Sequence, residues 1–61
     1  MNEYERDALV TTVAKILLKR AAPKHLAGHV DYMKDTHPMV LGAKEVADEV
    51  VTAVLTYLDT I

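Results

Sequence analysis

The last third of the chain carries the strongest structural signal in the sequence, because its apolar residues recur at spacings of four and three. The segment reads "GAKEVADEVVTAVLTYLDTI", and the repeat consists of Ala43, Ala47, Val50, Val54, Tyr57 and Ile61. This spacing is typical of a helix that packs along another helix. β-Branched residues are frequent here, but Val50 and Val51 are adjacent, which the strict alternation of a strand does not give. The pattern predicts a helix over residues 43–61.

The start of this helix has two candidate positions. Gly42, with Glu45 three residues later, is compatible with a helix cap followed by an acidic first turn. Alternatively, Asp35 or Thr36 caps the helix and Pro38 lies in its first turn, so that the helix begins near residue 37 with Gly42 inside it. The sequence leaves both positions open.

A second amphipathic pattern covers residues 4–21. Its apolar residues are Leu9, Val10, Val13, Ile16, Leu17 and Ala21. On a helix they lie together on one broad side, with Thr11, Thr12, Lys15 and Lys19 on the opposite side. Acidic residues precede basic ones along the segment, the order that the helix dipole favours. We predict a helix that ends before Pro23, since a proline disfavours helical geometry in the residue before it.

Between the two patterns, residues 23–35 give a weaker signal. Leu26, Val30 and Met33 are spaced for a short helix of two to three turns, and Pro23 suits its first turn. Gly28 inside the segment lowers helix propensity by about 1 kcal/mol, so an irregular connector is the alternative. The expected fold is all-α: residues 1–61 form one small domain, a hairpin of two long antiparallel helices with a short connecting helix.

The short length predicts a partner subunit. A chain of 61 residues buries only about 60% of the surface that its unfolded form exposes. Small domains are commonly stabilised by disulfides, metals or oligomerisation, and the chain has no Cys. We therefore expect a homodimeric helical bundle. Its predicted core and dimer residues are Leu9, Val13, Ile16, Leu17, Ala47, Val50, Val54, Tyr57 and Leu58.

The location expected from the sequence is cytoplasmic. The first residues, "MNEYE", are acidic and lack the apolar region of a signal peptide. No apolar run approaches the roughly 20 residues of a membrane span. The net charge of −2 argues against broad electrostatic binding to nucleic acid or anionic lipid.

Residues suited to catalysis or metal binding are few. The chain has no Ser, no Cys and no glycine-rich phosphate loop, so we expect no enzymatic activity and no cofactor. His25 and His29 are four residues apart and would share one face of a helix. Two imidazoles form only half of a stable zinc site, which needs further ligands. They remain weak candidates, and no metal site is expected.

A basic cluster at the end of the first helix supports an alternative function. Its members are Lys15, Lys19, Arg20 and Lys24, and they could contact a phosphate backbone. The last helix would be repelled by DNA, because residues 43–61 contain one lysine and four acidic residues, a net charge of −3. A small dimeric DNA-associated regulator is therefore the second hypothesis.

The leading hypothesis is a small non-enzymatic protein that acts as a homodimer and regulates or inhibits a partner protein. Tyrosine and methionine are side chains that protein-binding surfaces use frequently. The acidic outer face of the last helix offers a second contact surface. The candidate partner-binding residues are Tyr32, Met33, Met39, Glu45, Asp48, Glu49 and Thr52.

Overall fold

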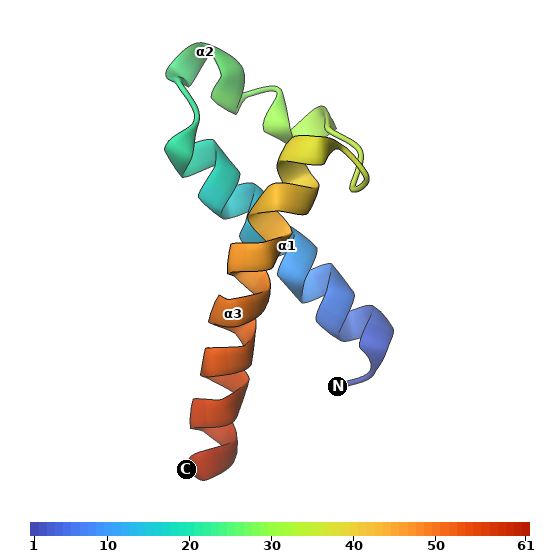
Figure 1. Cartoon of the computed structure of the whole chain (residues 1–61), viewed down its shortest axis with the longest axis vertical. Helices are drawn as coiled ribbons and strands as arrows, with labels where there is room; N and C mark the ends of the chain where they lie inside the picture. The colour runs from blue at the N-terminus through green and yellow to red at the C-terminus, as the bar shows by residue number, and fades with distance from the viewer.

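All regular elements of the chain are helices, as expected, and two long helices are joined by a connector with short helical turns (Figure 1). A computed structural model describes residues 1–61. The elements in order are α1 (Glu3–Ala21), α2 (Lys24–Ala27), the 3-10 turn η1 (Val30–Tyr32) and α3 (Pro38–Thr60). The all-α class and both long helices are thereby confirmed.

Local capping interactions set the ends of α1. The Asn2 side chain accepts a hydrogen bond from the Glu5 backbone N–H at 2.8 Å, and the Glu5 carboxylate accepts one from the Asn2 N–H at 3.5 Å. This reciprocal pair satisfies two donors that the first turn leaves free. At the other end Ala22 is extended, with ψ of 149°, as expected for the residue before Pro23.

The start of α3 corresponds to the earlier of the two candidate positions, with a different cap. His37 is the capping residue, and its Nδ1 accepts a hydrogen bond from the Met39 N–H at 3.1 Å. Pro38 follows at the first helical position, where the missing N–H of proline costs nothing. The prediction that Asp35 or Thr36 caps the helix is wrong, and Gly42 lies inside α3.

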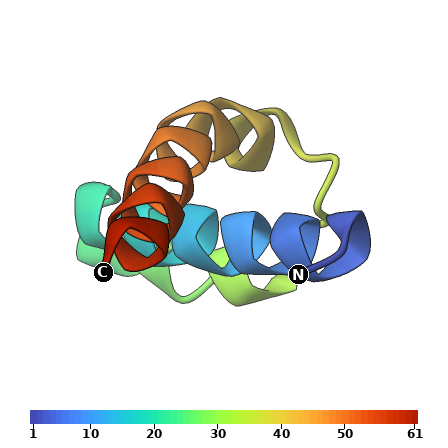
Figure 2. The same cartoon turned by 90° about the horizontal axis from the view of Figure 1, so that it is seen from below.

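The connector contains less helix than the predicted two to three turns. α2 is a single turn capped by Gly28, and η1 follows as a separate 3-10 turn. Figure 2 shows α1 between α3 and this connector. Two ion pairs join α1 to the connector, Lys15 to Asp35 at 3.2 Å and Lys19 to Asp31 at 2.5 Å.

Thr11 is buried, although the sequence pattern places it on the side of α1 opposite the apolar residues. Thr11 is 8% exposed, and its Oγ1 has no hydrogen-bond partner. Thr11 lies one helical turn before Lys15, which is paired with the connector, so both residues share the covered side. The sequence pattern of α1 alone does not reveal that the connector packs there.

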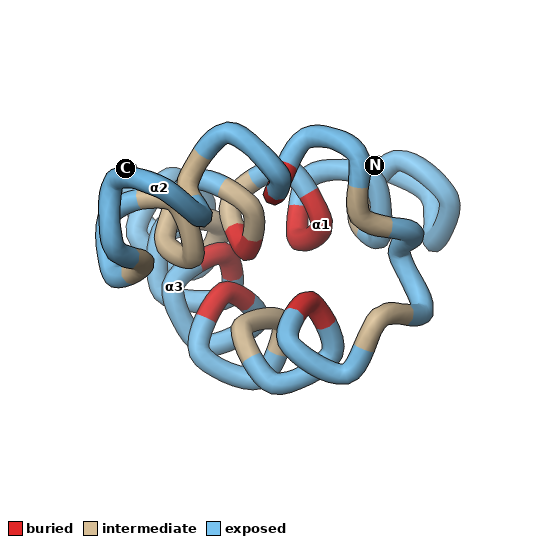
Figure 3. Tube along the Cα trace, turned by 90° about the horizontal axis from the view of Figure 1, so that it is seen from above, coloured by how far each residue is buried: buried red, intermediate tan, exposed pale blue.

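The core lies where α1 and α3 cross. Val10 and Ala14 of α1 pack with Ala47 and Val51 of α3, and the buried segments face one another (Figure 3). Ala14 and Ala47 are fully buried, and such small side chains allow the two helix backbones to approach closely. The long helices cross at a broad angle instead of lying side by side along their length (Figure 1). Their buried contact is consequently short.

The C-terminal end of α3 extends away from the rest of the molecule (Figure 1). Every residue from 56 to 61, here named the arm, is exposed. The molecule measures 40 × 20 × 15 Å, and its radius of gyration is 12.4 Å. A compact domain of this length has a radius of gyration of about 10.5 Å. Much of the apolar surface of α3 therefore lies outside the core.

Candidate interaction surface

Helix α3 has two apolar faces, and only one of them packs against α1. Val40, Ala47 and Val51 are buried on the first face. The second face, here named the α3 stripe, consists of Met39, Ala43, Val46, Val50, Val54, Tyr57 and Ile61. At 100° per residue the centre of the stripe lies about 80° around the helix from the centre of the packed face. No part of the chain covers most of the stripe.

The α3 stripe spans the whole helix. At 1.5 Å per residue it is about 33 Å long. Ala43, at one point along it, is half-buried, whereas the six larger side chains are exposed. Exposure is greatest in the arm, where Tyr57 is 66% and Ile61 82% exposed. A continuous apolar surface of this length typically marks a protein-interaction site.

An apolar groove includes the N-terminal part of the α3 stripe. It lies between the end of α1 and the start of α3 and has a volume of about 480 Å³. Its lining residues are Leu17, Leu18, Ala21, Met39, Gly42, Ala43 and Val46. A Cβ atom added at Gly42 would meet nothing within 4 Å. The small residues Ala21, Gly42 and Ala43 leave room for a large side chain from outside.

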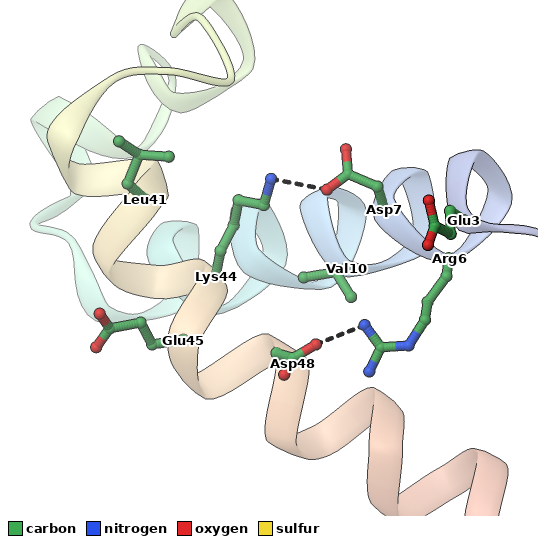
Figure 4. A pocket seen from close by; sticks show the side chains of 8 residues that line it. All are labelled: Glu3, Arg6, Asp7, Val10, Leu41, Lys44, Glu45 and Asp48. Atoms are coloured by element: carbon green, nitrogen blue, oxygen red, sulfur yellow. Dashed lines mark hydrogen bonds and ion pairs between the residues drawn. The ribbon is translucent and has the colours of Figure 1, made fainter.

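A polar hollow of about 650 Å³ lies between the start of α1 and the first half of α3 (Figure 4). Arg6 contacts Asp48 at 2.6 Å and the hydroxyl of Thr52 at 2.7 Å. Lys44 contacts Asp7 at 3.0 Å. These charged groups neutralise one another across the helix interface. The ion pairs that line the hollow therefore have a structural role, since they join α1 to α3 beside the core.

The four predicted partner-binding residues on the acidic face of α3 differ in their availability to a partner. Asp48 and Thr52 are engaged by Arg6. Glu45 and Glu49 are exposed, and the Glu45 side chain extends away from both ion pairs (Figure 4). Thus only part of the acidic face is available to a partner.

The three candidates nearest to the connector do not form one surface. Tyr32, 88% exposed, and the half-buried Met33 line a hollow of about 560 Å³ at the connector. Met39 instead lies in α3, where it lines the apolar groove. The connector and the groove are therefore two separate candidate contact regions.

The structure divides the predicted core and dimer residues into two groups. Ala47 is buried, and Val13 and Leu17 are half-buried against the core. The remaining six are exposed: Leu9, Ile16, Val50, Val54, Tyr57 and Leu58. The predicted seam over residues 43–61 thus mixed both apolar faces of α3.

Four stripe residues are not in the predicted core and dimer set. Ala43 and Ile61 belong to the predicted repeat over residues 43–61, whereas Met39 and Val46 are not part of it. These last two continue the spacing of Val50 and Val54 towards the start of the helix. This signal is visible in the sequence once the helix is extended back to Pro38.

The basic cluster is only partly free. Lys15 and Lys19 form ion pairs with Asp35 and Asp31 of the connector. Arg20 and Lys24 are exposed. Half of the lysine and arginine charge proposed for a phosphate backbone is therefore neutralised within the chain.

The histidines lie in different local settings. His25 belongs to α2, whereas His29 follows the end of that helix, and both are exposed. No three histidine, aspartate or glutamate side chains are grouped so that they could hold a metal ion. None of the helices combines the length and apolar character that a bilayer crossing needs.

Searches against protein-family models, curated proteins and solved structures gave no match to this chain.

Proposed function

We propose that this chain is a small non-enzymatic interaction protein that associates through the α3 stripe and regulates or inhibits a partner protein. The single observation that carries the proposal is the stripe itself, an apolar surface along all of α3 that the chain does not cover. Only seven residues are buried, so more large apolar side chains lie outside the core than in it. A surface of this kind is stable in water when another molecule covers it.

The acidic side of α3 indicates the chemistry of a regulated partner. Glu45 and Glu49 are one turn apart, exposed, and make no ion pair within the chain. A basic surface would be attracted electrostatically to both carboxylates. Complementary charge of this kind raises the rate of association and disfavours partners of the wrong charge. Tyr32 at the connector adds an exposed aromatic contact. The proposed partner therefore presents a positively charged surface.

The two alternatives are less well supported. The polar hollow contains several ionisable side chains, but Arg6, Asp7, Lys44 and Asp48 pair with one another. This pairing favours a structural role for the hollow over a catalytic one. The contacts of Lys15 and Lys19 with the connector reduce the charge available for DNA. A DNA-associated regulator thus remains the second hypothesis.

Affinity capture from extracts of the source cell tests the proposed function. The wild-type chain should retain a specific partner, and Val50→Asp should lose a partner that binds the stripe. Glu45→Lys combined with Glu49→Lys should keep the helical circular dichroism signal and lose a basic partner. Thr56→Asp, on the exposed side away from the stripe, is the control and should retain it. A chain that captures the same proteins before and after all these changes would contradict the proposal.

A further inference from the structure

We propose that the α3 stripe pairs with the stripe of a second copy of this chain, antiparallel about Val50, so that the arm of each copy covers the apolar groove of the other. This pairing rests on the proposed function, because it names the partner of the same surface. Each copy would contribute the same residues, which gives a closed two-fold dimer. The groove would then be completed by residues that only the partner copy supplies.

The spacing of the stripe is symmetric about its centre. From Met39 to Ile61 the intervals are 4, 3, 4, 4, 3 and 4 residues, which read the same in both directions. A two-fold axis at Val50 brings Ile61 of one copy to the level of Met39 of the other. The same axis brings Val54 to the level of Val46. Every apolar residue of the stripe therefore meets an apolar residue when the helices run in opposite directions.

Side-chain size also favours the antiparallel arrangement. The axis at Val50 brings Tyr57, the largest residue of the stripe, to the level of Ala43, the smallest. Ala43 lies in the apolar groove beside Gly42, where space is open. A large side chain opposite small ones allows close packing between helices. In a parallel pair the two arms would meet each other, and both grooves would stay open.

The exposed area of the chain matches the requirement of a dimer. A folded monomer of 6.8 kDa is expected to expose about 4,000 Å². This chain exposes 4786 Å², an excess of about 800 Å² over that expectation. A stable interface of standard size removes about 800 Å² from each partner. The surplus surface is thus close to what one two-fold interface covers.

Site-directed cross-linking tests the pairing and its direction, because the natural chain has no cysteine. A disulfide forms where Cα atoms lie about 4.4–6.8 Å apart. Val50→Cys should cross-link with itself under mild oxidation. Val46→Cys and Val54→Cys should cross-link with each other when mixed, and neither should do so alone, since self-pairing would span about 12 Å along the helix. Thr56→Cys, exposed and away from the stripe, is the control and should stay uncross-linked.

Sedimentation over a dilution series tests the dimer independently. The wild-type chain should reach twice its monomer mass, and Tyr57→Ala should weaken self-association by more than tenfold. Tyr4→Ala removes an exposed tyrosine of α1 that lies outside the stripe, and it should leave self-association unchanged.

Three results would overturn the antiparallel dimer. They are a monomeric mass at all concentrations, self-cross-linking of Val46→Cys, and cross-linking of Thr56→Cys to the same extent as Val50→Cys. A monomer that still loses a captured partner on Val50→Asp would overturn the dimer and leave the proposed function standing. If Val50→Asp captures the same proteins as the wild type while cross-linking follows the expected pattern, the proposed regulatory function is wrong and the dimer stands.

Discussion

Val50 and Val51 are adjacent in α3 and chemically identical, yet they belong to different surfaces. Val51 is 3% exposed and packs in the core against α1, whereas Val50 is 42% exposed and lies at the centre of the α3 stripe. Successive helical residues point about 100° apart, so a helix with two apolar faces can present one to each neighbour. A change at Val51 should therefore affect the stability of the single chain, whereas a change at Val50 should affect its association.

Aspartate at these two positions should give different results. Val51→Asp places a charge in the core without a partner, which costs several kcal/mol and should abolish the helical circular dichroism signal. Val50→Asp places the charge at a half-exposed position and should keep most of that signal while lowering the sedimentation mass. Circular dichroism and sedimentation on the same samples measure both effects. Greater loss of helix in Val50→Asp than in Val51→Asp would show that the core is misassigned.

Replacing Thr11 by valine should stabilise the fold. The buried Thr11 hydroxyl has no hydrogen-bond partner, and valine has nearly the same shape without the polar group. Removing an unsatisfied buried polar group should raise the free energy of unfolding by about 1 kcal/mol. Thermal and urea unfolding measure this change.

Thr12→Val is the matched control for that substitution. Thr12 is exposed and donates to the Ala8 carbonyl at 2.8 Å, and threonine and valine have similar helix propensities. Its effect on the free energy of unfolding should stay within about 0.5 kcal/mol. Equal effects at both positions would argue against the covering of Thr11 by the connector.

Gly42→Ala should also stabilise the chain. Gly42 lies inside α3, and its added Cβ would meet no atom within 4 Å. Alanine is favoured over glycine in a helix interior by about 1 kcal/mol. Ala53→Gly, at an exposed position of the same helix, should lower the free energy of unfolding by a similar amount. Urea unfolding of both variants gives the comparison, and a destabilising Gly42→Ala would mean that the groove has no room for a methyl group.

The sequence predicts the helices well because their signals are local. Apolar spacing defines α1 and α3, and Pro23 ends α1 through its effect on Ala22. The sequence does not decide between two start positions for α3, since Gly42 is both a possible cap and a tolerable interior residue. A histidine cap is uncommon, so His37 gave no signal of its own.

Tertiary packing explains what the sequence did not predict. Spacing shows that α3 has a wide apolar surface, but the crossing point with α1 decides that Ala47 and Val51 are buried and Val50 is not. The burial of Thr11 depends on the docking of the connector, which Asp31 and Asp35 help to fix. Neither feature is a property of one helix alone.

The cap at His37 gives the last prediction. Its Nδ1 accepts the Met39 N–H, one of the donors that the first turn of α3 leaves without an intrahelical partner. His37→Ala removes the acceptor and should lower the free energy of unfolding by about 1 kcal/mol. His37→Ser should equal or exceed the wild type, because serine is a preferred capping residue. His25→Ala, at an exposed position outside α3, should change stability by less than about 0.5 kcal/mol. Urea unfolding should therefore rank serine and histidine above alanine at position 37, and an alanine variant as stable as the serine variant would show that this hydrogen bond does not fix the start of α3.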